Sequence, residues 1–515
     1  MGFIVKLTKA DGSNVSQKEM DSLYLSDLQF RPLRKKKEII DGKVHIEGHS
    51  SPVIIHAMMP VMDYGYIWVT ADNQGEGYSK EDTEIDFVRE AAMTRLVEIQ
   101  NILESYGGEL SSEASAHISA CEEYLQLAEK KHGDKAYEFY HRALSHGLWG
   151  GELALFERSK AYKRSNPVFM LGCAAFGYEP GSDYAARFEK TFDLATLPFY
   201  LKEALKEEKR GYPNYDWVDK ILAWCKEKGI RTKGHPLWWN HVASTPEWLM
   251  DVDWETMKKE CIRTVKRSVE RYRNDIQIWD VVNEVHDWSN LNPISQDQMI
   301  EITRIACDAA RESNPDATLI VNNCLPFGEY VSQGLEAIKC NSNLKEDRPL
   351  FSPYTYLEAL FENNVEFDVI GIQLYWPTRD MVSISRLLDE YLKFGKPIHI
   401  TELGICSGDN HTDWADPQSK RTRWPLDHYL YGDGIWHAEW EWTEKIQADW
   451  LEQFYTMTYS KENIEALTWW SFYDPGYVPL SGLIRKDGVP KESYYRLHAF
   501  RDFIQKRINS QRKEH

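Results

Sequence analysis

The sequence predicts an α/β protein in which a (β/α)8 barrel of the TIM type follows a smaller β-rich domain. Three observations predict it: strand signals before residue 80, helical periodicity over residues 81–164, and alternating apolar strands and amphipathic helices over residues 165–515. A chain of 515 residues exceeds one ordinary domain and leaves room for a barrel beside a second unit.

Residues 1–80 carry the alternation and turn signals of a β-sandwich-like domain. Residues 39–40 and 44–46 flank Asp41-Gly42, a dipeptide typical of tight hairpin turns. Residues 53–59 and 66–70 are two further strand candidates, the second rich in aromatic and β-branched side chains. We therefore expect an antiparallel β domain at the start of the chain.

Residues 81–164 predict a helical connector. Apolar residues recur at helical spacing over 81–106, and Gly107-Gly108 ends that helix. A second helix is expected over residues 112–146, with a break at Gly133-Asp134. The glycines of residues 147–151 are interpreted as the interruption that follows it.

From residue 165 onward, strands and helices alternate in the manner of a parallel sheet. Closure of that sheet into a barrel fits the length of the segment, and in such barrels the carboxyl ends of the strands carry the active site. The expected strands cover residues 168–176, 230–237, 276–282, 318–321, 367–374, 398–401 and 466–471.

Composition excludes several classes of partner. A formal net charge of -19 argues against nucleic acid and anionic membranes, which attract basic surfaces. The 19 Trp and 28 Tyr residues suit either ordinary cores or stacking on sugar rings. No run reaches the length of a membrane span, and the first residues lack the apolar segment of a signal peptide. We therefore expect a cytoplasmic protein by default, or a secreted one if a signal was removed.

The eight cysteines are dispersed and form no CxxC pair, so we expect free thiols and no zinc site.

Two apolar runs each deliver a glutamate where a strand ends. Residues 278–284 read IWDVVNE and finish at Glu284, and residues 397–403 read PIHITEL and contain Glu402. One such polar residue at a strand end could be structural. A set at the same end of successive strands predicts an active site built on paired carboxyls; its other members are His235, Asn283, Asn322, Asn323, Gln373, Tyr375, Trp469 and Trp470.

At these residues the chain resembles glycoside hydrolase family 10, the retaining β-1,4-xylanases. Residues 279–284 (WDVVNE) are similar to that family's acid/base motif, and residues 400–403 (ITEL) to its nucleophile motif. Residues 192–239 align without gaps on the family pattern FNxxTxENxMKW…G…GHxLVWH. Residues 368–373, 468–470, 482–483 and 490–491 resemble its later motifs, so the likeness covers roughly residues 165–505.

The departures from the family pattern concern residues around the carboxyls. Pro198-Phe199 stands where typical members have a Glu-Asn pair that grips xylose, and Tyr375 stands where they have a histidine. Gly404 replaces the aspartate that usually follows ITEL, and Asn240 replaces the second histidine of GHxLVWH. This pattern suggests the same reaction on a possibly different glycoside.

The resemblance implies a role for each residue of the site. Glu402 would be the nucleophile and Glu284 the acid/base, with His235 and Tyr375 as donors beside Glu402. Asn283 would contact the sugar 2-hydroxyl. Trp469 and Trp470 would form a platform under the sugar, and Lys202, Trp239 and Gln373 would line the donor subsites. Such a reaction needs a carbohydrate partner and neither a metal nor an organic cofactor.

Three functions remain open at this point. The favoured one is a retaining glycosidase that cleaves β-1,4-xylosidic bonds of xylan or xylo-oligosaccharides. The second is a related glycosidase acting on a glucan or a decorated oligosaccharide, and the third is a carbohydrate-binding barrel without activity, which the presence of both glutamates disfavours. The first domain either binds carbohydrate or supports the barrel. Endo or exo mode and oligomeric state stay open.

Overall fold

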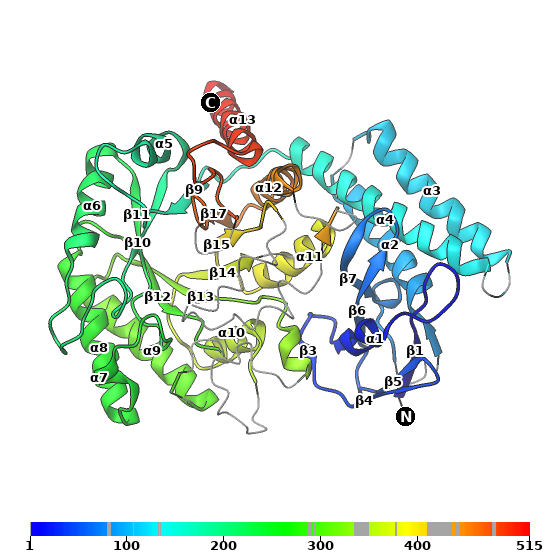
Figure 1. The fold of residues 1–515 in the computed structure, drawn as a ribbon, viewed down its shortest axis with the longest axis horizontal. Helices are drawn as coiled ribbons and strands as arrows, with labels where there is room; N and C mark the ends of the chain where they lie inside the picture. The colour runs from blue at the N-terminus through cyan, green and yellow to red at the C-terminus, as the bar shows by residue number, and fades with distance from the viewer. Residues whose placement is uncertain are drawn as a thin grey trace.

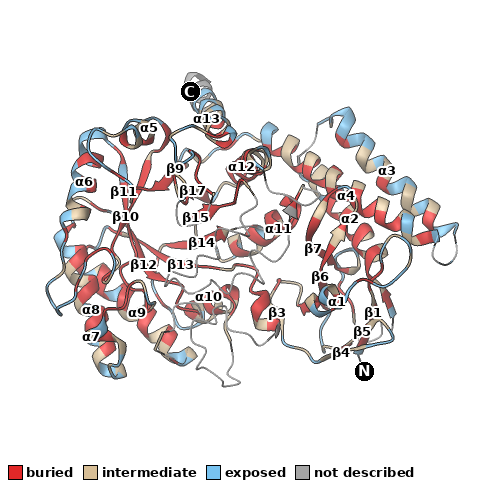
Figure 2. Cartoon of the chain, in the orientation of Figure 1, coloured by how far each residue is buried: buried red, intermediate tan, exposed pale blue. Residues whose placement is uncertain are grey.

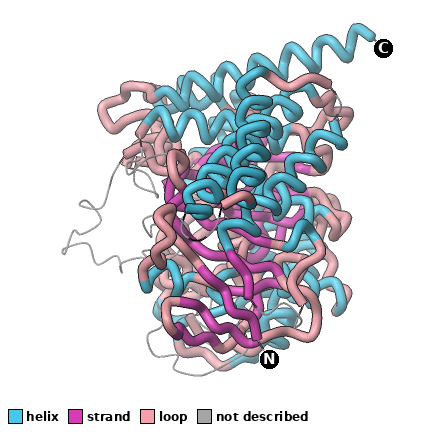
Figure 3. The backbone as a smooth tube through the Cα atoms, turned by 90° about the vertical axis from the view of Figure 1, so that its right-hand side faces the viewer, coloured by secondary structure: helices cyan, strands magenta, loops and turns pink. Residues whose placement is uncertain are grey.

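The computed structural model describes residues 2–79, 84–106, 108–131, 133, 135–286, 291–292, 294–333, 350–375, 378–408, 435–437, 443–475 and 480–514. Figure 1 shows a barrel with its surrounding helices on the left and the N-terminal sheets and helices on the right. Figure 3, turned to look from the right-hand side, shows N-terminal strands in front, toward the foot of the view, and helices stacked above them.

The N-terminal strands form two sheets. One has the order β4-β5-β1-β8, and the other has the order β16-β7-β6-β2-β3. The predicted hairpin at Asp41-Gly42 is confirmed, since β4 and β5 pair antiparallel on either side of it. The bounds are β1 Gly2–Lys6, β2 Tyr24–Ser26, β3 Pro32–Leu33, β4 Lys37–Ile40, β5 Lys43–Glu47, β6 Ile54–Val61, β7 Gly65–Ala71, β8 Glu84–Asp86 and β16 Ile435–Trp436, with α1 Gln17–Ser22 and η1 Asn73–Gly75 between them.

Three helices follow: α2 Phe87–Tyr106, α3 Ser112–Glu129 and α4 Lys135–Ala161. Two expectations are corrected here. The first predicted helix begins later than expected, because residues 84–86 form β8, which pairs parallel with β1. Helix α4 also runs through the glycines that were interpreted as an interruption. A Cβ on Gly147 would lie 3.0 Å from Arg95 Cγ and 3.1 Å from Cys121 Sγ, so that glycine allows α4 to approach α2 and α3 closely.

Eight strands of the described residues close the predicted parallel barrel, in the order β10-β11-β12-β13-β14-β15-β17-β9. Their bounds are β9 Met170–Ala174, β10 Leu194–Pro198, β11 Arg231–His235, β12 Ile278–Asn283, β13 Thr318–Asn323, β14 Val369–Tyr375, β15 Ile398–Gly404 and β17 Ile464–Trp469. The connecting elements are α5 Asp183–Thr191, α6 Asp216–Lys228, α7 Glu247–Met250, α8 Trp254–Arg271, α9 Gln296–Ser313, η2 Glu329–Gln333, α10 Pro353–Glu362, α11 Met381–Leu392, α12 Glu444–Tyr459 and α13 Glu492–Glu514.

Strand β10 was not among the strands expected from the sequence. Its five residues, LATLP, are few and end in a proline, so local pattern alone does not distinguish them from a loop. Its pairing with β9 and β11 supplies the missing signal, because both neighbours are long-range partners. The strands of the barrel are buried along their length, whereas α3 exposes its outer face (Figure 2).

Arg164 joins the connector to the barrel at the amino end of the strands. Its guanidinium is almost completely buried and donates hydrogen bonds to backbone carbonyls. The acceptors are the carbonyls of Asn166, Val168, Tyr459, Lys461, Glu462 and Ile464, at 2.8–3.1 Å. A planar fork of donors suits this arrangement, and a single ammonium group could not serve all six acceptors.

None of the helices in the described part of the chain is long and apolar enough to cross a membrane. Within the same residues, no group of three or more His, Cys, Asp and Glu side chains is placed to hold a metal ion. The cysteines described are buried and unbridged, as expected, and Cys340 lies outside the described residues.

Replacing Arg164 by lysine should lower the free energy of unfolding by roughly 2–4 kcal/mol, because buried carbonyls would lose their donors. Urea denaturation measures this change. Arg142 is a matched control: it forms an exposed pair with Glu138 on α4, and Arg142→Lys should change the stability by about 0.5 kcal/mol or less. Equal stabilities for Arg164→Lys and the native protein would contradict this role.

Candidate active site

Glu284 and Glu402 lie at the carboxyl end of the barrel, as the positions of their strands require. Glu284 directly follows β12, and Glu402 lies near the end of β15. Both side chains are buried, with exposed fractions of 5% and 4%. Two buried carboxyl groups need donors, because an unpaired charge away from water is costly.

A chain of side-chain amides links the two carboxyl groups. Gln373 on β14 donates to Glu284 Oε1 at 2.7 Å, and Asn322 on β13 donates to Glu402 Oε1 at 3.0 Å. Both amides also donate to the same acceptor, Asn283 Oδ1, at 3.2 and 2.7 Å respectively. The amides therefore orient the carboxyls relative to each other through one shared oxygen.

The carboxyl of Glu284 is set to remain protonated at neutral pH. Burial, followed by the negative charge of Glu402, raises the pKa of Glu284 to about 8. The hydrogen bonds from Gln373 and from Trp239 Nε1, which lies 2.9 Å from Glu284 Oε2, oppose that shift without cancelling it. A buried acid with a pKa above 7 can donate a proton in neutral solution.

Glu402 has different surroundings. Burial raises the pKa of Glu402 above its ordinary value, and His235, the hydrogen bond from Tyr375 and Lys233 reduce this rise without cancelling it. The hydroxyl of Tyr375 donates to Glu402 Oε2 at 2.5 Å, and His235 Nε2 lies 3.6 Å from Glu402 Oε1. Donors and cations surround this carboxyl, which favours its ionised form over that of Glu284.

A buried ion pair lies behind His235. Asp280 on β12 contacts His235 Nδ1 at 2.7 Å and Lys233 Nζ at 2.9 Å through the same oxygen, Oδ2. Burial raises the pKa of Asp280, yet Lys233 and His235 outweigh it and hold the pKa below its ordinary value. The ionised Asp280 fixes the orientation of the imidazole ring that faces Glu402.

The backbone at Glu284 adopts a left-handed conformation, with φ at 55°. Non-glycine residues rarely adopt this conformation, which costs on the order of 1–3 kcal/mol. The Glu284 amide donates to the carbonyl of Asn322 at 2.9 Å, and this bond holds the turn against β13. The turn aims the carboxyl toward Gln373 and Trp239 instead of continuing the strand.

Aromatic rings surround the two carboxyls. Trp239 stacks on His241 at 4.1 Å between ring centroids, and Trp470 meets His235 edge-on at 5.3 Å. The ring of Tyr200, two residues beyond β10, lies 5.6 Å from both His235 and Trp239. Such faces and edges suit the C–H surfaces of a sugar.

The structure does not bring every predicted residue into this cluster. The prediction of Trp469 as part of a platform is wrong: its side chain has no exposed surface, and Nε1 donates to the carbonyl of Ser481 at 2.8 Å. Trp470, the next residue, contacts His235 instead. The ammonium of Lys202 pairs instead with Glu247 of α7 at 3.1 Å in a solvent-exposed contact.

Two departures from the family pattern have structural reasons. Phe199, in place of a polar residue, is buried against Trp279 and Tyr272, with ring centroids 5.0 and 5.5 Å away. A Cβ on Gly404 would lie 2.7 Å from the carbonyl oxygen of Trp470, so this position has no room for a side chain. An aspartate at position 404 is therefore incompatible with this packing.

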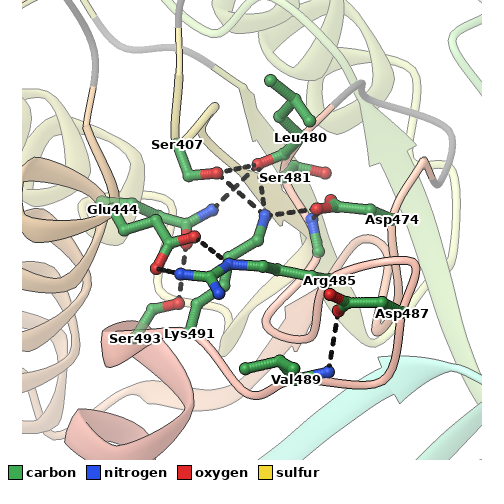
Figure 4. A network of polar contacts seen from close by, with 12 residues as sticks. Ser407, Glu444, Asp474, Leu480, Ser481, Arg485, Asp487, Val489, Lys491 and Ser493 are labelled. Atoms are coloured by element: carbon green, nitrogen blue, oxygen red, sulfur yellow. Dashed lines mark hydrogen bonds and ion pairs between the residues drawn. The ribbon is translucent and has the colours of Figure 1, made fainter.

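Behind β15, a buried lysine supports the chain that follows Glu402 (Figure 4). Lys491 Nζ pairs with Asp474 Oδ2 at 2.6 Å and donates to Ser407 Oγ at 2.8 Å and to the carbonyl of Leu480 at 3.0 Å. Asp474 also accepts from the amide of Gly482 at 2.9 Å. The motif residues near the end of the sequence thus hold the end of β15 in place.

Three residues of the site were not predicted as site residues: Lys233, Asp280 and Tyr200. The first two carry a signal in the sequence, because a charged residue inside a buried strand needs a partner. Tyr200 has no such signal, since its place depends on the turn of the chain after β10.

The barrel and its paired carboxyls define a class of carbohydrate-cleaving enzyme, and comparison with known proteins identifies the family. Residues 161–477 match the model of glycosyl hydrolase family 10. The match covers more than half of the chain, and the protein belongs to this family. It is therefore a glycoside hydrolase.

Individual relatives are distant. The chain is 27% identical over 382 residues to endo-1,4-beta-xylanase A of Caldicellulosiruptor saccharolyticus, a match that covers 68% of this chain and 97% of that protein. It is 25% identical over 252 residues to endo-1,4-beta-xylanase B of Neocallimastix patriciarum, covering 47% of this chain but only 27% of that protein's length.

Among solved structures, native xylanase 10B from Thermotoga maritima aligns with a TM-score of 0.49 and 21% identity, over 67% of this chain and 97% of that one.

Replacing Glu402 by glutamine should lower the pKa of Glu284, because the variant removes the negative charge that helps to raise it. In a 13C NMR titration of glutamate carboxyls, the Glu284 signal should titrate near pH 8 in the native protein and at a lower pH in the variant. Glu260→Gln is a control, because it removes a buried carboxyl that lies on helix α8 and not at the end of a barrel strand. An unchanged Glu284 titration in Glu402→Gln would refute the coupling.

Proposed function

We propose that the protein hydrolyses β-1,4-xylosidic bonds of xylan or xylo-oligosaccharides with retention of anomeric configuration, using Glu402 as nucleophile and Glu284 as acid/base. The observation that supports this most strongly is the difference between the two carboxyls. Glu284 has its pKa raised to about 8, and Glu402 is surrounded by donors and cations. One acid and one carboxylate are what a double displacement needs.

In the first step, an oxygen of Glu402 attacks the anomeric carbon while Glu284 gives its proton to the departing glycosidic oxygen. The bond to the leaving sugar breaks, and a covalent glycosyl-enzyme forms. The hydrogen bonds from Tyr375 and Asn322 fix the attacking carboxylate. Positive charge develops on the sugar ring, and the adjacent carboxylate of Glu402 stabilises that charge until the new bond forms.

In the second step, Glu284, now ionised, takes a proton from water, and the resulting hydroxide equivalent attacks the anomeric carbon. The bond to Glu402 breaks and the sugar leaves with its original configuration. Esterification of Glu402 removes the negative charge that raises the pKa of Glu284, so Glu284 becomes a base at the moment when a base is required.

The choice of xylan rests on the relatives. Both curated proteins reported above are named endo-1,4-beta-xylanases. The alternative, a glucan or a decorated oligosaccharide, is not favoured by them. Pro198-Phe199, in place of the usual Glu-Asn pair, nevertheless alters the side of the site expected to bind the donor sugar. There Phe199 packs on Trp279, away from the carboxyls.

Tyr200 supplies a further substrate contact on that side. Its hydroxyl forms no hydrogen bond with any residue that the structure describes, although its ring is held by Phe176, His235 and Trp239. Burial, with the charges of Glu402 and Glu284, raises the pKa of Tyr200 well above its ordinary value, so the phenol stays protonated. A protonated phenol near both carboxyls can bind a sugar hydroxyl.

Glu402→Gln should reduce the rate of xylo-oligosaccharide hydrolysis by about a thousandfold or more, because an amide cannot form the glycosyl-enzyme. Reducing-sugar assays on xylan, xylo-oligosaccharides and cello-oligosaccharides measure both activity and preference. The exposed Glu247→Gln is a matched control and should stay active. Near-native activity in Glu402→Gln would reject the assignment.

Proton NMR of early products should show the β-anomer first, because two inversions at one carbon preserve its configuration. The measurement follows the anomeric signals during the first minutes of hydrolysis, before mutarotation mixes them. Initial formation of the α-anomer would exclude the double displacement, whichever sugar is cleaved.

Tyr200→Phe should lower kcat/KM on xylo-oligosaccharides about three- to tenfold, through loss of one neutral hydrogen bond. Steady-state kinetics with the native protein and the variant give this ratio. Tyr212→Phe is the control, because Tyr212 is 67% exposed on the surface. Equal kcat/KM values for native protein and Tyr200→Phe would show that the hydroxyl does not touch the substrate.

A further inference from the structure

Residues 378–381, which follow β14 and include the first residue of α11, are bonded to four different elements of the N-terminal part. The carbonyl of Thr378 accepts from the Trp68 amide on β7 at 2.9 Å. The guanidinium of Arg379 is buried and donates to the Tyr24 hydroxyl on β2 at 2.9 Å. Both contacts lie just beyond the end of the strand that carries Tyr375.

The next two residues contact the connector helices. Asp380, which caps α11 and has no exposed surface, pairs with Arg95 of α2 at 2.9 Å. The amide of Met381 donates to Glu152 Oε1 of α4 at 2.7 Å. Four consecutive residues are thus held by two strands of one sheet, β7 and β2, and by two helices, α2 and α4.

Glu152 also binds the chain that follows β15. The indole Nε1 of Trp436 donates to Glu152 Oε1 at 2.8 Å, and His437 Nε2 contacts Glu152 Oε2. Strand β16, which contains Trp436, pairs antiparallel with β7 and covers that edge of the N-terminal sheet. One buried carboxylate, 1% exposed, therefore bridges the segments that follow the Tyr375 strand and the Glu402 strand.

These two strands meet at the reacting centre, where Tyr375 donates to Glu402 Oε2 at 2.5 Å. A hydrogen bond of this kind depends on the relative position of β14 and β15 within a few tenths of an ångström. The barrel ladder fixes the strands themselves, and the N-terminal part holds residues 378–381, shortly after β14, and residues 436–437, which follow β15 later in the sequence. Figure 1 shows α11, β7 and α4 in neighbouring positions where the two parts of the molecule meet.

We propose that the N-terminal part is a positioning device of the catalytic barrel, and that Glu152 is its central positioning residue, which holds the Tyr375–Glu402 contact by bridging the segments after β14 and β15. This inference rests on the proposed role of Glu402. It assigns the first 160 residues a task in catalysis through contacts with the barrel, in contrast to binding carbohydrate at a separate site.

The acid limb of the pH profile of kcat/KM provides a readout that a purely structural role would not change, because it reports ionisation of the nucleophile in the free enzyme. Loss of the Tyr375 bond destabilises ionised Glu402, raises its pKa and moves the acid limb to higher pH. Among the described residues, the titratable and charged groups that face Glu402 are Asp280 of β12, Glu284 directly after it, His235 and Lys233 of β11, Tyr375 of β14 and Tyr200 after β10. All six remain in a Glu152 variant.

The test compares Glu152→Ala, Tyr375→Phe and the double variant on 4-nitrophenyl β-xylobioside. Tyr375→Phe should move the acid limb upward by about one pH unit. Glu152→Ala should move it in the same direction and lower kcat about tenfold or more. The double variant should shift no further than Tyr375→Phe alone, because both changes act on one contact. Glu152→Gln keeps an acceptor for Met381 and Trp436 and should restore most of the native profile.

Glu462→Ala is the matched control. Glu462 also joins the two parts, accepting from the amides of Ser165 and Asn166 at 2.7 Å, but at the amino end of the barrel. The Glu462→Ala variant should be less stable than the native protein, but the acid limb of its kcat/KM profile should be unchanged. If the acid limb of the kcat/KM profile shifted in Tyr375→Phe but stayed unchanged in Glu152→Ala, the inference would be overturned. The proposed function would remain intact. No hydrolysis by the native protein would reject the proposed function itself.

Discussion

The burial of two carboxyl groups side by side is the constraint on which the architecture of the site depends. Each group lies away from water, where an unpaired charge is costly and two adjacent negative charges are costlier still. The protein resolves this by keeping a proton on Glu284 and surrounding Glu402 with donors. Asn283 Oδ1 receives the amides that serve both carboxyls, so neither group can move without disturbing the other.

The remainder of the barrel end serves this arrangement. Asp280 and Lys233 lie inside strands, where their mutual pairing makes burial tolerable and fixes His235. The left-handed turn at Glu284 stores local strain, and its amide bond to β13 holds that strain in place. Lys491 and Asp474 hold the chain just after β15, through the contact of Lys491 with Ser407.

Much of this could be predicted from the sequence because its signals are local. Periodicity placed seven of the barrel strands, and strand ends that finish in polar residues located the carboxyls. Strand β10 was missed because five residues ending in proline carry no periodic signal, and α4 was cut short because its glycines resemble a helix end. The conformations of β10 and of the α4 glycines depend on partners that are distant in the sequence. Trp469 and Trp470 are adjacent in sequence, and only their packing shows that the second one faces the site.

The pairing of Arg95 with Asp380 has a consequence for where this molecule can be divided. The family match begins at residue 161, which suggests that the barrel could be excised as an independent unit. Asp380 has no exposed surface, and its cationic partner belongs to α2. A fragment without α2 would contain a buried carboxylate with no counter-ion, at the start of a helix that packs on the barrel. The start of the family match therefore does not coincide with a division in the ion pairs of this structure, and a barrel cut at residue 161 would lose the cationic partner of Asp380.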